Sequence, residues 1–454
     1  MTRWLLLATP LAAIALFAYL VSQGWPQEAA ITAGITMVCA VWWIFEPIPI
    51  PFTSLIPLAL LPLFGVLSAA EVGQAFGSPL ILLLMGGFML STAMADSGAH
   101  RRVALYMVNV FGGGSARGLV LGFMVAAAVL SMWISNTATT LMLLPVALAV
   151  LERTDRKMAV PLLLGIAYAA SIGGLGTPIG TPPNLIFMQV HLDQFGTAPN
   201  FVQWMGWGMP VVILLVPLAG FWLTRGLTLS QPVELPPSGE WTTYEKRVFV
   251  MFSVTAMAWI TRQAPFGGWS GWLNLPQAND ASVALVAVIL MATLPDGKGG
   301  RLLHWESAAK IPWGVLLLFA GGISIASAFV SSGLAEIMAD QLTALVELPT
   351  WVLILSLCLG VTFLTEVTSN TATASLLMPL LAAIAVATDI NPILLMVPAA
   401  LSASCAFMLP VATAPNAIVY GSQLIRVKDM VRAGFVLNVI GAIVITMVCV
   451  AILD

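Results

Sequence analysis

Two identical polar motifs interrupt apolar stretches of this chain. A Ser-Asn-Thr-Ala-Thr run occurs at 135–139 and again at 369–373. The side-chain oxygens of Ser, Asn and Thr cap the helix that follows them, and they satisfy backbone groups where water is absent. The free N–H groups and the positive dipole end of such a helix favour an anion in front of it. The carbonyls before it, with the Ser and Asn oxygens, suit a hard cation such as Na⁺.

A second pair of motifs accompanies the first. Gly-Thr-Pro-Ile-Gly-Thr-Pro-Pro-Asn covers 176–184, and Leu-Pro-Val-Ala-Thr-Ala-Pro-Asn covers 409–416. Clustered Gly and Pro do not remain in regular helix, so each surrounding span should be broken midway. The unwound carbonyls can then complete cation coordination beside each SNT motif. The alternatives are a plain proline kink here and polar helix packing at the SNT motifs, and the duplication of both pairs favours binding.

The duplication extends over most of the chain. Gly-Gly at 86–87 returns at 321–322 and Ser-Gly at 97–98 returns at 332–333, both 235 residues on, while the SNT and Pro-Asn motifs return after 234 and 232. An odd number of predicted crossings, about five, separates equivalent points, so the two copies are inverted. We predict repeats at 29–227 and 248–454, a cytoplasmic linker at 228–247 and an unpaired first helix in 1–28. Inverted repeats are typical of transporters that bind near the midplane.

The elements that must position these motifs are membrane helices. Of 454 residues, 59% are hydrophobic and 8% are charged, whereas soluble domains carry about 25% charged residues. Apolar runs of about 20 residues recur throughout, and β-barrel alternation is absent. We predict an all-α polytopic membrane protein with about 11 spans, at roughly 4–23, 29–45, 51–68, 78–95, 160–190, 206–225, 248–261, 281–294, 311–330, 392–422 and 433–452.

The two segments that hold the SNT motifs are predicted to be re-entrant helical hairpins, at 117–157 on the cytoplasmic side and at 349–389 on the external side. Each arm is short for a crossing that ends in polar residues. With Arg3 in the cytoplasm, this arrangement places every Lys and Arg except Arg262 in cytoplasmic loops, as the positive-inside rule requires. Treating either hairpin as a full crossing would destroy that bias. Asp193, Glu336, Asp340 and Asp389 then lie outside, as does the C-terminal Asp454.

The first apolar run and the cysteines have simple interpretations. The run from Trp4 to Val21 is long for a signal peptide and lacks a convincing cleavage site, so we read it as the first span. All four cysteines lie in apolar segments and are predicted to be buried thiols, neither disulfides nor metal ligands: Cys39, Cys358, Cys405 and Cys449.

Positive side chains are absent from the predicted midplane, and His100, His191 and His304 are all expected in loops. An anion there must be held by helix N-termini, hydroxyls, amides and co-bound cations, so its affinity should depend on sodium. Glu366 is the acid nearest the second SNT motif. It could carry protons, but we favour a structural acid that braces the hairpin. Glu46 and Asp96 are read as boundary residues at span ends.

These motifs resemble those of the divalent-anion:sodium symporter family, the dicarboxylate, citrate and sulfate carriers. Paired SNT motifs are its hallmark, and its C-terminal signature is present at 404–419. The resemblance covers nearly the whole chain apart from the first predicted span. It implies a homodimer in the bacterial inner membrane, in which a transport domain moves as an elevator against a scaffold. It also implies symport of Na⁺, two or more ions, with a C4-dicarboxylate such as succinate, malate or fumarate.

Carried over by motif, the resemblance implies two sodium sites beside one substrate site. One sodium site would use Ser131, Ser135, Asn136 and Gly180. The other would use Thr365, Thr368, Asn370 and the carbonyl of Ala412. The substrate would meet Ser135, Asn136, Thr137, Ser369, Asn370, Thr371, Thr413 and Ala414. Asn136 and Asn370 would touch both ion and substrate, which couples the two bindings.

Several alternatives stay open. Many relatives have a second proline where this chain has Ala414, so substrate choice is open among C4-dicarboxylates, citrate, sulfate and sulfonates. A sodium-independent dicarboxylate exchanger of the same fold is the main alternative. A proton-coupled or arsenite efflux permease would need a buried titrating acid, for which Glu366 is the candidate. An enzyme is disfavoured because no intramembrane histidine or carboxylate pair is predicted. We expect no ATP-binding motif, no other metal and no nucleic-acid partner.

Overall fold

The computed structural model describes residues 4–112, 115–152, 154, 156–227, 240–263, 267–334, 337 and 349–453. Within these ranges the chain is helical, and its only β-type pairing is an isolated bridge between Pro295 and Arg301. Some sequence predictions concern residues outside the described ranges: Arg3, Arg153, residues 228–239 of the linker, Glu336, Asp340 and Asp454.

Apolar helices run through the whole described chain. Seven helical stretches in it are long and apolar enough to cross a membrane: Leu5–Ser22, Gln27–Phe45, Ala69–Ser97, Arg156–Gly176, Phe201–Thr224, Trp313–Ser331 and Val427–Leu453. Shorter apolar helices accompany them, and α3 (Ile50–Leu63) and α14 (Asp280–Thr293) lie where spans were predicted. The predicted all-α polytopic fold is confirmed.

The order of elements repeats along the chain. After α1 (Leu5–Ser22), the first half contains α2 (Gln27–Phe45), α3, α4 (Ala69–Phe76), α5 (Pro79–Ser97), a hairpin, a broken helix and α11 (Phe201–Thr224). The second half contains, in the same order, α12 (Thr243–Ile260), α14, α15 (Trp305–Ala308), α16 (Trp313–Ser331), a hairpin, a broken helix and α22 (Val427–Leu453). Additional helices are α6 (Ala99–Phe111) and α13 (Gly268–Trp272).

Each SNT motif lies at the turn of a helical hairpin. The first hairpin consists of α7 (Ala116–Ser131) and α8 (Asn136–Leu151), and the second of α18 (Thr350–Thr365) and α19 (Asn370–Thr388). Three of the four arms have 16 residues. Such an arm is about 24 Å long, which is shorter than the roughly 30 Å hydrocarbon core of a bilayer. The length agrees with arms that end inside the membrane.

Each Pro-Asn motif breaks a helix, as its glycines and prolines predict. The first broken helix consists of α9 (Ala159–Gly173), the short 3₁₀ helix η2 (Gly174–Gly176) and α10 (Pro182–Phe195). The second consists of α20 (Pro392–Ser402) and α21 (Ala414–Tyr420). The peptide groups between the halves lose their intrahelical partners and need others.

The asparagine of each motif supplies part of that need. Asn184 Nδ2 donates to the carbonyl oxygens of Gly174 at 2.9 Å and Thr177 at 2.8 Å. Asn416 Nδ2 donates to those of Ala406 at 3.2 Å and Leu409 at 3.0 Å. Both asparagines are fully buried. Each therefore ties the second half of a broken helix to the unwound segment before it.

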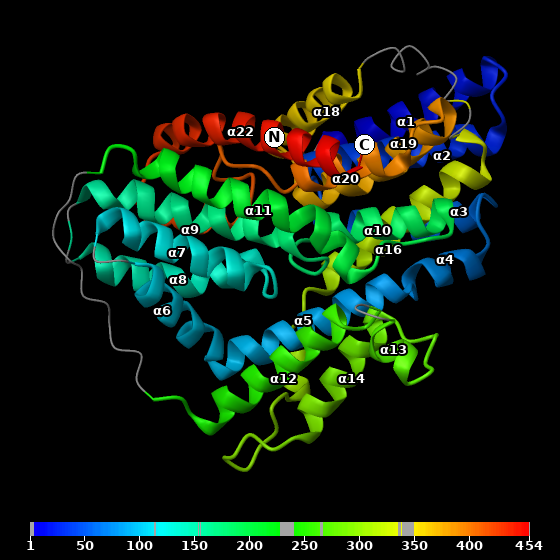
Figure 1. Cartoon of the computed structure of the whole chain (residues 1–454). Coiled ribbons are helices and arrows are strands. Elements are labelled where there is room, and N and C mark those ends of the chain that lie inside the picture. The colour runs from blue at the N-terminus through cyan, green and yellow to red at the C-terminus, as the bar shows by residue number, and fades with distance from the viewer. Residues whose placement is uncertain are drawn as a thin grey trace.

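The helices form two groups that mix both halves of the sequence. In one, α3 packs on α16, and α5 packs on α14 and α12. In the other, the hairpins and broken helices gather with α11 and α22: α21 packs on α8 and α9, α10 packs on α19, and α11 packs between α9 and α22. Figure 1 shows α9, α11 and α22 near one another on the side of the molecule away from α12 and α14. The groups meet where α10 and α19 pack on α16.

Two of the three histidines predicted in loops lie in helices. His100 belongs to α6, an amphipathic helix that buries Ala104, Leu105 and Val108. Its charged residues lower its mean hydropathy, so it was not predicted as a membrane span. His191 is buried in α10, which continues beyond the predicted end of its span to a left-handed Gly196. His191 Nδ1 lies 2.6 Å from the Thr197 carbonyl oxygen. His304 does lie outside a helix, at the start of α15.

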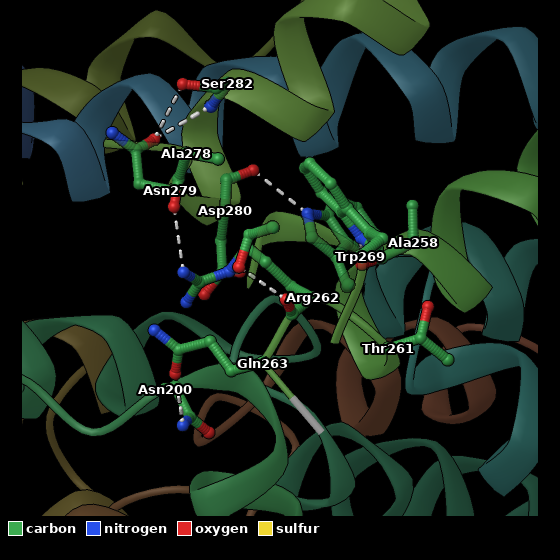
Figure 2. Close-up of polar contacts among 12 residues, drawn as sticks. Asn200, Ala258, Thr261, Arg262, Gln263, Trp269, Ala278, Asn279, Asp280 and Ser282 are labelled. Carbon is green, nitrogen blue, oxygen red and sulfur yellow. Dashed lines mark hydrogen bonds and ion pairs between the residues drawn. The ribbon is translucent and has the colours of Figure 1, made fainter. Parts of the chain in front are cut away.

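Arg262, the basic residue that departs from the predicted charge bias, is buried rather than free in a loop. Its Nε donates to Asp280 Oδ1 at 2.6 Å and its Nη1 to the Ala278 carbonyl at 2.9 Å (Figure 2). The next residue, Gln263, accepts a 2.8 Å bond from Asn200, which caps α11 (Figure 2). This contact joins the two helix groups at one end of the molecule.

The predicted topology can be tested beside this ion pair. The exposed Gln277 belongs to a segment predicted outside, and the exposed Lys298 to one predicted in the cytoplasm. In intact cells, Gln277→Cys should react with a membrane-impermeant maleimide and Lys298→Cys should not. The native cysteines are buried and should give little background. Labelling of Lys298→Cys but not of Gln277→Cys would show that the protein has the opposite orientation in the membrane.

Candidate functional site

Both motif pairs line one cavity of about 840 Å³. It lies between the hairpin tips, the broken helices, and parts of α2, α3, α5 and α16. The following residues, from the four motifs and directly beside them, line it: Ser135, Asn136, Thr137, Gly180, Thr181, Thr368, Ser369, Asn370, Thr371, Ala412, Thr413 and Ala414. Segments more than 200 residues apart in the sequence thus converge on one space.

The serine of each SNT motif caps the second arm of its hairpin. Ser135 Oγ accepts from the Ala138 N–H at 3.2 Å, and Ser369 Oγ accepts from the Ala372 N–H at 3.4 Å. The first turns of α8 and α19 therefore begin at the cavity wall, where their remaining free N–H groups and dipoles favour negative charge. This is the capping that the motif composition predicts.

Oxygen atoms converge on the amide of Asn136. One amide position lies 2.5 Å from Ser131 Oγ, 3.2 Å from the Ala170 carbonyl oxygen and 3.3 Å from the Gly180 carbonyl oxygen. With nitrogen at that position, the amide donates to all three. With its oxygen there, four oxygens face one another, which is an environment that a hard cation stabilises. A Cβ on Gly174 would lie 2.9 Å from this position, so only glycine leaves it open.

The second repeat has a matching cluster around Asn370. Thr365 Oγ1 lies 2.9 Å from Asn370 Oδ1 and donates to the Ala403 carbonyl at 2.9 Å. Thr365 therefore matches Ser131. Ala403 has the repeat position of Ala170, although its carbonyl contacts the Thr365 hydroxyl rather than the asparagine amide. Sequence reasoning missed both alanines, because a backbone carbonyl leaves no mark in residue type. The repeat spacing of about 233 could have found one from the other.

The remaining predicted ion ligands have different positions relative to the cavity. Ser131 and Thr365 are fully buried and contact the cavity through their asparagines. Thr368 lines the cavity, and its hydroxyl lies 3.0 Å from the Leu364 carbonyl and 2.5 Å from Thr373 Oγ1. Gly180 and Ala412 also line it. All the predicted site residues are thus brought to one region.

Other lining residues were not predicted. Glu46 ends α2 in a left-handed conformation, as a boundary residue would, and it also lines the cavity. Trp133, in the turn before the first SNT motif, stacks on Phe201 and Trp259 with ring centroids 6.0 and 6.5 Å apart. Thr181 Oγ1 lies 3.2 Å from Ser404 Oγ and links the two broken helices. The aromatic ring of Trp133 and the hydroxyl of Thr181 gave no sequence signal of a binding site, because such side chains are common in helix packing.

Glu366 braces the unwound segment of the second broken helix. Its Oε1 accepts from the backbone N–H groups of Phe407 at 2.7 Å and Met408 at 2.8 Å, and its Oε2 accepts from that of Leu409 at 3.0 Å. Asn438 Nδ2 donates to Oε1 at 2.8 Å. The carboxylate is buried with four donors around it. This geometry is that of a structural acid, the role favoured from the sequence.

Inverted repeats that bring two hairpin tips and two broken helices to one cavity define a secondary transporter. The comparisons with known proteins agree. A family model described as "Citrate transporter" matches residues 40–395. The chain belongs to this family of membrane transporters and is not an enzyme.

Individual relatives extend the match to almost the whole chain. It is 38% identical over 449 residues to the sodium-dependent dicarboxylate transporter SdcS of Staphylococcus saprophyticus, covering 93% of this chain and 86% of the relative. It is 38% identical over 453 residues to SdcS of Staphylococcus aureus, covering 94% and 86%.

Solved transporter structures share the fold. The YdaH transporter of Alcanivorax borkumensis superposes with a TM-score of 0.60 at 15% identity, covering 86% of this chain and 88% of that one. MtrF of Neisseria gonorrhoeae gives a TM-score of 0.58 at 14% identity, covering 86% and 83%. At such identities the likeness concerns architecture alone.

Replacing either central asparagine should abolish transport without unfolding the protein. Asn136→Ala or Asn370→Ala removes the amide that faces both the oxygen cluster and the cavity. A hydrogen bond to a charged group contributes about 1.5–3 kcal/mol, and losing contacts to both ion and anion should lower uptake about 100-fold or more. Uptake into proteoliposomes measures this. Asn109→Ala, on the exposed face of α6, is the matched control; normal uptake by the Asn136 or Asn370 variant would remove that residue from the site.

Replacing Glu366 should destabilise the protein. Glu366→Ala removes the acceptor of the Met408 and Leu409 N–H groups and the nearer acceptor of the buried Phe407 N–H, which keeps only a 3.3 Å bond to Asn438 Oδ1. Each lost hydrogen bond costs about 1–3 kcal/mol. We expect the melting temperature in detergent to fall by roughly 5 °C or more, with a smaller fall for Glu366→Gln, which keeps one acceptor oxygen. Lost uptake with an unchanged melting temperature would instead support a proton-carrying role.

Proposed function

We propose that this protein imports C4-dicarboxylates such as succinate, malate and fumarate by symport with Na⁺. The observation that carries the proposal is the pair of matching oxygen clusters, at Asn136 and at Asn370, on either side of one cavity. None of the described residues that line the cavity is Lys, Arg or His. A divalent anion there depends on helix N-termini, hydroxyls, amides and co-bound cations.

Electrostatics explains the coupling in this proposal. Two opposite unit charges about 4 Å apart attract by roughly 4 kcal/mol at the effective dielectric near a protein surface. Cations in the two clusters would offset the charges of two carboxylates and raise the affinity for the dianion. The dianion would raise the affinity for the cations by the same factor, because coupling between binding sites is reciprocal.

The proposal assigns residues that line or adjoin the cavity to two ions and one substrate. One Na⁺ would be held by Ser131, Ser135, Asn136 and Gly180, with the Ala170 carbonyl nearby. The other would be held by Thr365, Thr368, Asn370 and the Ala412 carbonyl. The carboxylates would meet Ser135, Asn136, Thr137, Ser369, Asn370, Thr371, Thr413 and Ala414.

The relatives support this choice of ion and substrate. The SdcS proteins carry the name sodium-dependent dicarboxylate transporter, and they match this chain over most of both lengths. The family model carries the name citrate transporter, and the cavity of about 840 Å³ has room for a tricarboxylate as well. Citrate is therefore the second candidate substrate.

Alternating access would move the hairpin-bearing helix group against the other group, as an elevator. Glu46, Ile50, Pro312 and Val315 line the cavity at ends predicted to be cytoplasmic, which supports an inward-facing state. The other end is held by cross-group contacts: Asn200 with Gln263, Gln194 Nε2 with the Ala326 carbonyl at 3.2 Å, and Ser78 with Gln189. These contacts would open on the outward stroke.

The cellular setting is also part of the proposal. We place the chain in the bacterial inner membrane as a homodimer, with its N-terminus in the cytoplasm and its C-terminus outside. Each protomer would contain the two inverted repeats at 29–227 and 248–454, joined by a cytoplasmic linker.

Radiolabelled succinate uptake into proteoliposomes tests the function. An inward Na⁺ gradient should drive uptake, and a K⁺ gradient of the same size should not. The dependence on Na⁺ should have a Hill slope above one, because two clusters bind ions. Uptake that ignores Na⁺ and requires internal dicarboxylate would make the protein an exchanger. Sodium-driven uptake of citrate without uptake of succinate would make citrate the substrate in place of C4-dicarboxylates.

A further inference from the structure

A second cavity, of about 470 Å³, lies away from the transport site on α12 and the end of α14. Its walls combine two basic side chains with apolar ones: Lys246, Arg247, Val250, Met251, Leu294, Pro295 and Leu302. None of these residues lines the transport cavity. We refer to this feature as the α12–α14 groove.

The basic side of the groove is held in place by the end of α14 and the loop that follows it. Arg247 Nη1 donates to the Pro295 carbonyl at 2.6 Å, and Arg301 Nη1 donates to the Thr293 carbonyl at 2.5 Å. Tyr244 Oη donates to the Leu302 carbonyl at 3.2 Å and ties α12 to the same loop. The guanidinium of Arg247 has five N–H donors, so its bond to Pro295 fixes its position and leaves donors for a ligand.

Positive charge exceeds negative charge around the groove. The exposed side chains of Lys298 and Arg301 belong to the same loop as its wall residues Pro295 and Leu302. The acid of that loop is Asp296, whose Oδ1 already accepts the backbone N–H groups of Lys298 at 2.6 Å and Gly300 at 2.9 Å. The groove is therefore suited to an anion.

The apolar side of the groove continues along the surface of the two helices. On α12, Val250, Val254 and Met257 are 56%, 57% and 56% exposed. On α14, Val286 and Ile289 are 55% and 60% exposed. In a membrane transporter such outward-facing apolar surface contacts acyl chains. A ligand with an anionic head and an apolar tail would match both parts at once.

We propose that the α12–α14 groove is a binding site for an anionic glycerophospholipid. The phosphate would contact Lys246 and Arg247, the glycerol backbone would fill the groove between Val250 and Leu294, and the acyl chains would lie along α12 and α14. Basic pockets on the cytoplasmic side of membrane helices suit such headgroups. A basic loop alone attracts anionic lipid only diffusely, whereas the walled groove predicts a discrete site.

Native mass spectrometry of the purified full chain in neutral detergent tests the site. Titration with phosphatidylglycerol should give one saturable adduct per protomer that phosphatidylcholine does not give. Each basic residue strengthens binding to anionic lipid about fivefold, so Lys246→Gln/Arg247→Gln should weaken the adduct about 25-fold. The matched control is Lys428→Gln/Arg432→Gln, an exposed basic pair on α22, which should change binding less than about twofold.

A second pair of variants tests whether lipid binding depends on the shape of the groove as well as on its charge. Val250→Trp fills the groove and keeps both basic residues, and it should also weaken the phosphatidylglycerol adduct. Ile213→Trp, at an apolar position of α11 that is 61% exposed, should not. Equal losses in the two basic pairs, or full binding by Val250→Trp, would overturn the proposal. So would equal binding of phosphatidylcholine, or competition by free glycerol 3-phosphate at the concentration of the lipid.

Discussion

The satisfaction of backbone hydrogen bonds inside the membrane is the constraint on which the rest of this structure depends. A transport site at membrane depth needs carbonyls and N–H groups that face a cavity, and those groups exist only where a helix is interrupted. Every interruption exposes other peptide groups to an apolar surrounding, at a cost of several kcal/mol each. The chain resolves this conflict with buried side chains that take the place of missing helical partners. Asn184 and Asn416 do so in the two broken helices.

The two repeats brace their interruptions with different chemistry. In the second, the Glu366 carboxylate accepts three consecutive backbone N–H groups of the unwound segment. In the first, Met132 stands at the position equivalent to Glu366, and its carbonyl accepts the hydroxyl of Thr177. A carboxylate with four donors is strongly held, whereas a single hydroxyl bond is a weaker tie. The two repeats are therefore alike in the oxygen clusters at Asn136 and Asn370 and unlike in what supports them.

The arrangement of the helices also keeps the candidate binding groups together in one helix group. The oxygen clusters, the capped hairpin arms and the broken helices pack together in one helix group, so the groups that would hold ions and anion keep their mutual distances. Contacts to the other group are fewer and include single side-chain bonds such as that between Asn200 and Gln263 (Figure 2). A rigid binding unit against a partner held by separable contacts is the arrangement that alternating access needs.

The sequence by itself determined the helical membrane fold, the duplicated motifs, the capped hairpin tips and the broken helices. Each of these follows from local chemistry: apolar runs of bilayer length, Ser and Asn before a helix, and Gly and Pro within one. These predictions depend on residues close together in the chain, where composition and spacing are sufficient. For Glu366 the sequence favoured a structural acid but left a proton-carrying role open, and the donors around its carboxylate became visible only in the tertiary structure.

Only the tertiary structure decided which distant groups meet. The carbonyls of Ala170 and Ala403 contact the oxygen clusters at Asn136 and Asn370 because helices pack there, and the residue type of an alanine does not indicate how its carbonyl is used. Arg262 lies in the loop after α12, but its side chain is buried against Asp280, 18 residues away at the start of α14. His191 proved to be helical, because α10 continues past the predicted end of its span. Contacts between helices depend on how their whole surfaces pack together. Many residues contribute to that packing, so no single residue type predicts which groups will meet.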